Sequence, residues 1–584
     1  MINQFNYNRR ISSVVNIGNL LLGGNHPIRV QSMANTDTND IQNSVAQCLR
    51  IVEAGGDLVR FTAQGVREAE SLKLIWDGIR AKGSDVPLVA DIHFNANAAD
   101  VAAKQVEKVR INPGNYVGSV KIGDTSDYTD EEFEAEYQKV RARFIPFLEI
   151  CQQHKTAIRI GVNHGSLSER MMNRFGDTSR GMVESCMEFL RICHEENFND
   201  VVISMKTSNT VMMVQTVRLL MDEMAKENLY FPLHLGVTEA GDGEDGRIKS
   251  AVGIGALLAD GIGDTIRVSL SEEPEAEIPV AKSLVSYIAK RENHNQIVAV
   301  ENLLFDRYEY TRRKTHAVGI IGGENVPVVL ASKDGDFGTV PDFILEHSEN
   351  PVYSVAEIDL LLHDTSEMKF LKISFPELTP QLLGLLIERK DIVVLLTTNH
   401  LNGVGEQRAF FHTLLNAGCT VPVVISRKYY ENDLQQLQIK AAADLGILFI
   451  DGFGDGIFIE NEGTISVEEL NSVAYGILQA SRVRVTKTEY ISCPGCGRTM
   501  FNLQTVIAQI KARTSHLKGL KIGIMGCIVN GPGEMADADY GYVGAGRGKV
   551  SLYKKKECVE RNIPEDEAVE KLIELIKING DWQE

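Results

Sequence analysis

A short β-branched strand, a turn and a longer amphipathic helix-like stretch recur eight times between residues 26 and 271. This alternation predicts parallel strands joined by helical crossovers. Eight such units in about 250 residues are typical of a closed (β/α)8 barrel. A doubly wound open sheet could use the same elements, but the number of units favours closure. The predicted strands are Ile28–Met33, Leu58–Ala63, Leu88–Asn95, Val109–Gly114, Ala157–Asn163, Val201–Lys206, Leu233–Thr238 and Thr265–Leu270.

A second series of strands and helices follows a predicted helix at residues 272–292. Its strands are rich in Val, Ile and Leu with little alternation, as in parallel strands covered on both faces. Their carboxyl ends carry Ser, Thr, Asn399 or Asp451 in place of arginines, so we expect a structural insert without a catalytic group. The run Asp-Gly-Phe-Gly-Asp-Gly from Asp451 resembles a phosphate-binding loop, but so short a pattern is weak evidence. The predicted strands are Val326–Ala331, Phe370–Phe375, Ile392–Thr397, Val421–Ser426 and Leu445–Ile450.

The chain has 584 residues, more than one hydrophobic core supports, which predicts several domains. A third region begins near residue 482, with a helix expected over residues 500–514, a strand over 521–525 and a final helix over 565–578. The long, charged connection at residues 124–144 is expected to add a helix to the barrel. We therefore expect an α/β protein with a TIM barrel at residues 1–292, an α/β insert at 293–481 and a small α/β domain at 482–584.

Three cysteines of the last domain have a spacing that indicates a metal centre. Cys493 and Cys496 form a Cys-Pro-Gly-Cys pair, and Cys527 follows in a glycine-rich segment that runs to Glu534. Iron–sulfur clusters use such cysteine sets, with backbone N–H groups directed at the sulfurs. Three thiolates leave one iron without a cysteine, so that iron needs another ligand or keeps an open site. An open iron can bind and reduce a substrate.

Zinc is the main alternative, because a structural zinc site can use three thiolates and one histidine. Only His516 lies between Cys496 and Cys527, and its spacing is not a familiar zinc spacing. Zinc sites also usually consist of two close pairs, whereas the second half here is a single cysteine. The motif therefore favours an iron–sulfur centre, and a disulfide is the least expected outcome because nothing else indicates export.

Composition argues against several classes of protein. The net charge of −19 gives little electrostatic support for binding to nucleic acid or to a membrane surface. No stretch approaches the roughly 18 apolar residues of a membrane span, and we find no apolar core of a signal peptide near the N-terminus. The remaining cysteines of the first two regions are expected to be buried and reduced, which fits a cytoplasmic protein. They are Cys48, Cys151, Cys186, Cys193 and Cys419.

Basic residues gather at the carboxyl ends of the predicted barrel strands, where barrel active sites form. Side chains alternate along a strand with period two, which directs the polar residues of these strands to one mouth. Four arginines and a lysine in one cavity are costly unless an anion neutralises them, and guanidinium groups bind phosphate oxygens in pairs. The expected ligand is a diphosphate or two phosphates. The set comprises Arg60, Asp91, Arg110, Arg159, Asn163, Lys206, Arg267 and Ser269.

Internal salt bridges are the alternative role of these cations, with Asp37, Asp91 and Glu239 as partners. Five basic groups and three acids would leave positive charge unpaired, so an anion site is favoured. Glu239 follows the seventh predicted strand, and a carboxyl group beside bound phosphates can keep a raised pKa and supply a proton. His93 and His234 fit barrel packing and function equally well.

Together these features resemble one known family, the 4-hydroxy-3-methylbut-2-enyl diphosphate synthases of the methylerythritol phosphate route to isoprenoids. The matching motifs occur in order and span both ends of the chain, which is more specific than any single motif. They are Val-Gln-Ser-Met (30–33), Val-Arg-Phe-Thr (59–62), Ala-Asp-Ile-His-Phe (90–94), Val-Arg-Ile-Asn-Pro-Gly-Asn (109–115), Arg-Ile-Gly-Val-Asn-His-Gly-Ser-Leu (159–167), Ser-Met-Lys (204–206), Leu-Gly-Val-Thr-Glu-Ala-Gly (235–241), Asp-Thr-Ile-Arg-Val-Ser-Leu (264–270), Cys-Pro-Gly-Cys-Gly-Arg-Thr (493–499) and Gly-Cys-Ile-Val-Asn-Gly-Pro-Gly-Glu (526–534).

The resemblance implies a [4Fe–4S] cluster held by Cys493, Cys496, Cys527 and the carboxylate of Glu534, which substrate can displace. It implies an iron–sulfur oxidoreductase that opens the ring of 2-C-methyl-D-erythritol 2,4-cyclodiphosphate with two electrons. Water is lost and 4-hydroxy-3-methylbut-2-enyl diphosphate is formed, with single electrons from ferredoxin or flavodoxin. The family's substrate-binding positions match the eight polar residues of the barrel mouth, and its acidic residue matches Glu239.

One departure from the compact family members is the insert of about 190 residues, which resembles a longer three-domain form known in plants and some bacteria. In the compact form a cluster domain caps the barrel of a partner subunit. The insert leaves open whether this chain caps itself, and a homodimer is one possibility. Two further alternatives are a non-catalytic iron–sulfur or zinc sensor, and a pterin- or phosphate-binding barrel transferase with an unrelated metal tail. A sensor would not need both an open iron and a phosphate site.

Overall fold

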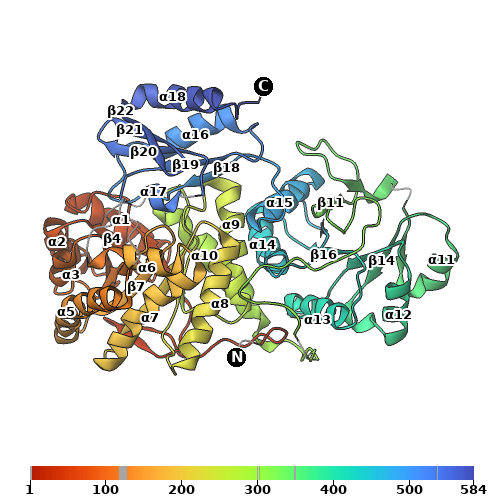
Figure 1. Cartoon of the computed structure of the whole chain (residues 1–584), viewed down its shortest axis with the longest axis horizontal. Coiled ribbons are helices and arrows are strands. Elements are labelled where there is room, and N and C mark those ends of the chain that lie inside the picture. Colours follow the sequence, from red (N-terminus) through yellow and green to blue (C-terminus); the bar gives the residue numbers. More distant parts are fainter. Residues whose placement is uncertain are drawn as a thin grey trace. The chain divides into compact units, whose positions relative to one another are not determined.

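The protein was analysed as a computed structural model, which describes residues 3–117, 128–298, 300–301, 303–347, 350–529, 531–535 and 537–583 (Figure 1). The chain forms two compact units. The barrel unit contains residues 10–246, 263–282 and 487–584, and the insert unit contains residues 1–9, 247–262 and 283–486.

The barrel unit contains eight parallel strands. Neighbours follow chain order from β3 to β8, while β10 pairs with both β3 and β9. A parallel bridge between Ile203 and Leu233 joins β8 to β9 and completes the ring. This order excludes a doubly wound sheet and confirms the predicted TIM barrel. The strands are β3 (Arg29–Met33), β4 (Leu58–Ala63), β5 (Leu88–Ile92), β6 (Lys108–Ile111), β7 (Ala157–Asn163), β8 (Val201–Lys206), β9 (His234–Leu235) and β10 (Thr265–Ile266).

Helices connect these strands along the chain (Figure 1). α1 shows why they start where they do, since the Asp40 side chain accepts a hydrogen bond from the backbone N–H of Asn43. α5 supplies the expected helix of the long connection, although residues 124–127 lie outside the described residues. The helices are α1 (Ile41–Glu53), α2 (Val66–Ala81), α3 (Ala96–Ala102), α4 (Pro113–Tyr116), α5 (Asp130–His154), α6 (Glu169–Phe175), α7 (Ser179–Glu195), α8 (Thr210–Lys226), α9 (Gly243–Ala259) and α10 (Glu277–Ala289).

A short hairpin closes the amino-terminal end of the barrel. Its strands β1 (Val15–Ile17) and β2 (Leu20–Leu22) pair antiparallel. Their apolar side chains pack with side chains from the barrel strands in one buried cluster, so this end is sealed by hydrophobic burial. The cluster consists of Val15, Ile17, Leu22, Leu58, Val89, Ala157 and Val202.

The insert unit is built on a sheet of seven parallel strands. The strand order is β12-β11-β17-β16-β15-β14-β13. Strands β13 to β17 lie side by side in chain order, β11 pairs with β17, and β12 and β13 form the two edges of the sheet. The strands are β11 (Val328–Ala331), β12 (Phe343–Ile344), β13 (Val352–Ser354), β14 (Lys369–Ile373), β15 (Ile392–Leu396), β16 (Val423–Tyr429) and β17 (Gly456–Asn461), and the longer helices are α11 (Ile358–His363), α12 (Pro380–Glu388), α13 (Gly403–Asn416), α14 (Leu434–Ile450) and α15 (Val467–Ala480).

One predicted strand of the insert was wrong. Residues Leu445–Ile450 form the last turns of α14, whose continuous buried apolar sequence cannot be told from a buried strand by periodicity. The strand is instead β17, which sequence reasoning missed. The glycine run that starts at Asp451 leads from α14 into β17. No helix follows to present its N-terminus, so this run lacks the geometry of a phosphate-binding loop.

The last domain has a mixed five-stranded sheet, with β18–β20 parallel and β20–β22 antiparallel. Figure 1 shows α16 and α18 on the same side of this sheet, and their apolar faces share one core with it. The strand Lys521–Met525 and the helix Glu565–Ile578 have the predicted bounds. The elements are β18 (Glu489–Ser492), α16 (Leu503–Thr514), β19 (Lys521–Met525), α17 (Gly531–Glu534), β20 (Tyr540–Gly546), β21 (Lys549–Lys554), β22 (Glu557–Pro564) and α18 (Glu565–Ile578).

The three sheets fall within the ranges 1–292, 293–481 and 482–584, while the domain limits themselves stay a prediction. Among the helices of the described residues, none combines the length and apolar composition needed to cross a membrane. The five cysteines expected to be buried and reduced are buried and free of disulfides. Burial raises the pKa of Cys48 to about 12, which keeps this thiol protonated and unreactive.

His412 of α13 is a buried polar group in an aromatic cluster of the insert unit. Its ring centroid lies 5.5 Å from that of Phe5, 5.4 Å from Phe305 and 5.5 Å from Phe453. Neither ring nitrogen has a hydrogen-bond partner within the described part of the chain. Burial lowers the pKa of His412 to about 4 from its usual 6.5.

We expect His412→Leu to reduce the acid sensitivity of this unit. Between pH 6.5 and about 4, His412 is protonated in the unfolded chain but stays neutral in the folded protein. The free energy of unfolding therefore decreases as the pH is lowered through this window. The loss reaches about 3 kcal/mol at its lower end. Urea unfolding at pH 7 and pH 5 checks this, with the exposed His363→Leu as control. An equal pH dependence in both variants and the wild type would contradict it.

Candidate functional site

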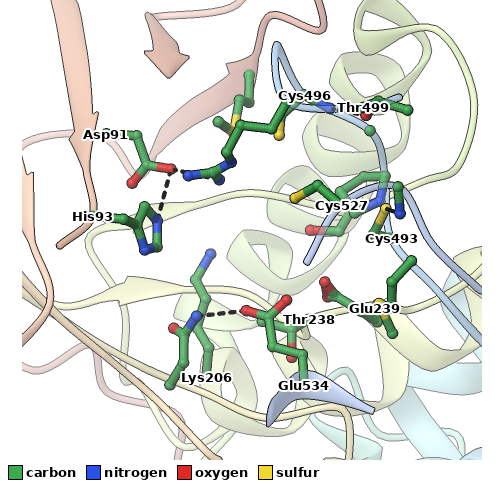
Figure 2. Close-up of a pocket in the computed structure, with 18 of the residues that line it drawn as sticks. Asp91, His93, Lys206, Thr238, Glu239, Cys493, Cys496, Thr499, Cys527 and Glu534 are labelled. Carbon is green, nitrogen blue, oxygen red and sulfur yellow. Dashed lines mark hydrogen bonds and ion pairs between the residues drawn. The ribbon is translucent and has the colours of Figure 1, made fainter. Parts of the chain in front are cut away.

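One pocket in the barrel unit brings together every residue predicted to bind an anion or a metal (Figure 2). Barrel residues enter it from the carboxyl ends of the strands, and the last domain contributes its cysteine loops and α17. Figure 2 shows Asp91 and His93 across the pocket from Cys493. The predicted residues that line it are Arg60, Asp91, Arg110, Arg159, Asn163, Lys206, Glu239, Arg267, Ser269, Cys493, Cys496, Cys527 and Glu534.

The last domain covers the mouth of the barrel of its own chain. Ala240, after β9, forms a parallel bridge with Ser492 at the end of β18. The Ser271 hydroxyl donates a hydrogen bond to the Cys493 carbonyl oxygen at 2.9 Å. A side chain at Gly165 would collide with the backbone of Gly533, so the two loops meet only because both residues are glycine. The sequence alone did not decide this pairing.

Two of the arginines are held by internal partners. Arg110 Nη1 lies 3.2 Å from Asp91 Oδ1 and donates to His93 Nε2 at 2.6 Å. Arg267 forms two hydrogen bonds with Glu277, at 3.0 and 2.8 Å. The salt-bridge alternative is therefore correct for these two side chains. Glu277 was not among the acids considered from the sequence, because it lies on the helix α10 and not on a predicted strand.

The other two arginines, Arg60 and Arg159, have no carboxylate hydrogen-bond partner among the described residues. Arg60 directs Nε and Nη2 at the Met33 sulfur, at 3.0 and 2.8 Å, and a thioether is a weak acceptor. Arg159 Nε and Nη1 are buried and have no hydrogen-bond partner among the described residues. Burial lowers the pKa of Arg60 to about 10, and burial with Arg60 nearby lowers that of Arg159. The pocket therefore has uncompensated donors suited to an anion.

Two carboxyl groups meet on another side of the pocket. Glu239 lies beside Glu534, and burial together with this neighbour raises the pKa of Glu239 well above its usual range. Its backbone φ of 50° lies in the left-handed region, which is strained for a residue with a side chain. Asn163 Nδ2 donates to Glu534 Oε1 at 2.7 Å. Burial and the neighbouring carboxyl group therefore favour the protonated form of Glu239 beside the cysteines.

The cysteine loops are ordered by their own backbone. The N–H of Gly526 donates to Cys493 Sγ at 3.2 Å, and the N–H of Cys496 donates to Thr499 Oγ1 at 3.0 Å. The three cysteines are free of disulfides. Within the described residues, no three His, Cys, Asp or Glu side chains are placed to hold a single metal ion. A polynuclear cluster is larger than one ion, and N–H groups directed at sulfur are typical of iron–sulfur sites.

The structure distinguishes the two histidines that fitted packing and function equally well, His93 and His234. His93 lines the pocket, and burial with Arg498 and Arg110 nearby lowers its pKa to about 3, so its ring is neutral. His234 is buried inside the barrel, with Nδ1 3.4 Å from Thr265 Oγ1, and is absent from the residues described as lining the pocket. Sequence reasoning missed Met33, Thr238, Arg498 and Thr499, which also line it.

Comparison with known proteins places these residues in a defined family. The GcpE TIM-barrel domain matches residues 12–282, and the GcpE protein C-terminal domain matches residues 489–578. A protein of Parabacteroides distasonis is 58% identical, with 99% of each chain covered, and one of Porphyromonas gingivalis is 53% identical, with 100% of each chain covered. Both are named 4-hydroxy-3-methylbut-2-en-1-yl diphosphate synthase (flavodoxin).

Proposed function

Because this chain belongs to the GcpE family, we propose that it catalyses the reductive ring opening of 2-C-methyl-D-erythritol 2,4-cyclodiphosphate. The product is 4-hydroxy-3-methylbut-2-enyl diphosphate, an intermediate of isoprenoid biosynthesis by the methylerythritol phosphate pathway. One carbon–oxygen bond of the ring opens, two electrons and protons are consumed, and one oxygen leaves as water. The observation that carries this proposal is the meeting of uncompensated arginines and three cysteines in one pocket.

Cys493, Cys496, Cys527 and Glu534 would hold a [4Fe–4S] cluster. When bound, the cluster supplies the electrons one at a time and an iron with a replaceable oxygen ligand. The set of donors fits, because three free thiols and one carboxylate share the pocket and backbone N–H groups face sulfur. A carboxylate is a harder ligand than a thiolate, so it is the ligand that a substrate oxygen can replace.

The barrel residues bind and orient the substrate. Arg60, Arg159 and Lys206 supply the positive charge for its phosphates, and Asn163 holds Glu534 in place. Glu239 holds a proton at its carboxyl oxygen, where it can be donated to the departing oxygen. The covering domain keeps water away from this reaction.

The partner that supplies electrons is flavodoxin, the donor that the names of both relatives include. The single chain carries both halves of the site, so we expect a monomer to suffice for turnover, with a homodimer as an accessory state. The protein is expected in the cytoplasm, where its buried free cysteines stay reduced.

The proposal is tested by anaerobic turnover of the purified protein with the cyclodiphosphate and reduced flavodoxin. We expect the allylic diphosphate product, water, and two reduced flavodoxin molecules each oxidised by one electron per turnover. Iron and sulfide analysis on the same sample checks the cluster. A zinc-loaded, redox-silent protein would support the sensor alternative, and a colourless protein that binds pterin would support the transferase alternative.

We expect Arg159→Ala to weaken binding of the cyclodiphosphate by about 1.5–3 kcal/mol, the range for hydrogen bonds to charged groups. Arg159 Nε and Nη1 have no hydrogen-bond partner among the described residues, so the substitution breaks no hydrogen bond of these two atoms. Arg110→Ala should weaken binding by a similar amount but also remove the Arg110–Asp91 ion pair, so that Asp91 keeps only His93 and the more distant Arg498. Arg159→Lys should recover only part of the affinity, because an ammonium group cannot form the guanidinium fork.

Isothermal titration calorimetry of anaerobic protein measures these affinities. The exposed Arg67→Ala on α2 is the control, since it removes an arginine from the same domain outside the pocket. Unchanged affinity for the cyclodiphosphate in both alanine variants would mean that these arginines take part only in internal contacts of the barrel.

A further inference from the structure

Arg498 reaches the pocket from the cysteine loop of the last domain. The loop is a tight turn, in which the N–H of Thr499 donates to the Cys496 carbonyl oxygen at 2.9 Å. Gly497 packs on the barrel, because a side chain there would lie 2.6 Å from the carbonyl oxygen of Thr36. Arg498 is only 6% exposed. The turn and the packing of Gly497 fix the point from which the Arg498 side chain enters the pocket.

The contacts of Arg498 leave most of its donors unused. Its Nη2 lies 3.6 Å from Asp91 Oδ2, an ion pair too long for a hydrogen bond. Asp91 already contacts Arg110 at 3.2 Å and His93 at 3.4 Å. Nε and Nη1 of Arg498 are buried and have no partner in the described part of the chain. Buried donors without partners are costly, so a ligand that accepts from them is favoured.

These unused donors face the same pocket as those of Arg159, and Arg60 lines that pocket with only the weak Met33 sulfur as acceptor. Arg159 and Arg60 belong to barrel strands, whereas Arg498 belongs to the covering domain. An anion in the pocket can therefore accept hydrogen bonds from both domains at once. A diphosphate has enough oxygens for guanidinium groups on two sides.

We propose that Arg498 binds a phosphate oxygen of the cyclodiphosphate, so that the bound substrate ties the cluster domain to the barrel. Asp91 holds the Arg498 side chain near the phosphate position before substrate arrives. This inference rests on the proposed function and adds a substrate-binding residue outside the barrel. The same side chain could instead serve only to neutralise the thiolates of Cys496 and Cys527, which lie near it.

The two roles differ in what a substitution changes. A phosphate ligand affects substrate affinity, whereas a neutralising charge affects the reduction potential of the bound cluster. Arg498→Met removes both the charge and the fork, and Arg498→Lys keeps the charge alone. Arg513→Met is the matched control, because Arg513 lies on α16 of the same domain and pairs with Glu570 at the surface.

The experiment uses the full-length holoprotein, prepared anaerobically, with calorimetric titration of the cyclodiphosphate and potentiometric titration followed by electron paramagnetic resonance. We expect Arg498→Met to raise the dissociation constant about 10- to 100-fold. Arg498→Lys should keep the wild-type potential and still bind several-fold more weakly, and Arg513→Met should match the wild type.

The inference would be overturned if Arg498→Lys bound the cyclodiphosphate with wild-type affinity while Arg498→Met shifted the reduction potential of the cluster. Arg498 would then serve to neutralise the cysteine thiolates. If Arg498→Met fails to hold the cluster, the affinity of Arg498→Lys decides alone. A wild-type protein that does not bind the cyclodiphosphate would overturn the proposed function itself, which separates that failure from this one.

Discussion

Cys493→Ser, Cys496→Ser and Cys527→Ser are each expected to abolish turnover and to remove or degrade the brown iron–sulfur chromophore. A serine hydroxyl is a poor replacement for a thiolate ligand, because it remains protonated and binds iron weakly. Glu534→Ala should keep most of the iron and sulfide yet lose turnover, since it changes the ligand of one iron without removing a thiolate. Anaerobic absorption spectra with iron and sulfide analysis measure both effects.

Cys558→Ser is the matched control for this series. Cys558 lies on β22 of the same domain, is half-buried, and is not among the residues described as lining the pocket. It should keep colour and activity. If all four pocket variants retained full iron, sulfide and activity, the assignment of the cluster ligands would be wrong.

Glu239→Gln is expected to lower kcat about 100- to 10,000-fold, the range for loss of a general acid. The amide keeps the size of the side chain but has no acidic proton to donate. Substrate affinity should change only a few-fold, because the arginines that bind the phosphates are untouched. Steady-state kinetics and calorimetry separate the two quantities. If Glu239→Gln kept the wild-type kcat, Glu239 would not be the proton donor.

Mixing Glu239→Gln chains with Cys527→Ser chains tests which chain completes which site. Each variant lacks one half, and the cluster domain covers the barrel of its own chain. We therefore expect no recovery of activity in the mixture. Differently tagged chains that co-purify would show that mixed dimers form, if the protein dimerises. Recovered activity would mean that the cluster of one chain serves the barrel of another.

Much of the fold followed from local patterns. The runs of β-branched residues predicted all eight barrel strands, and the strand Lys521–Met525 and the helix Glu565–Ile578 have the bounds expected. These elements are determined by nearest-neighbour propensity and by burial on known faces. The strand prediction for Leu445–Ile450 was wrong because a helix buried on most sides has the same continuous apolar sequence as a buried strand.

The sequence also determined which residues belong to the site. It did not determine which arginines have acidic partners or which barrel the cluster domain covers. Period-two alternation directs Arg60, Arg159 and Lys206 to the barrel mouth, and the cysteine spacing identifies a centre in the last domain. Which arginines are neutralised depends on how the side chains of neighbouring elements are oriented, as when Glu277 of α10 turns toward Arg267. Which barrel the cluster domain covers depends on long-range contacts such as that of Ala240 with Ser492. Contacts between residues distant in sequence leave no local pattern, so only the tertiary structure could decide them.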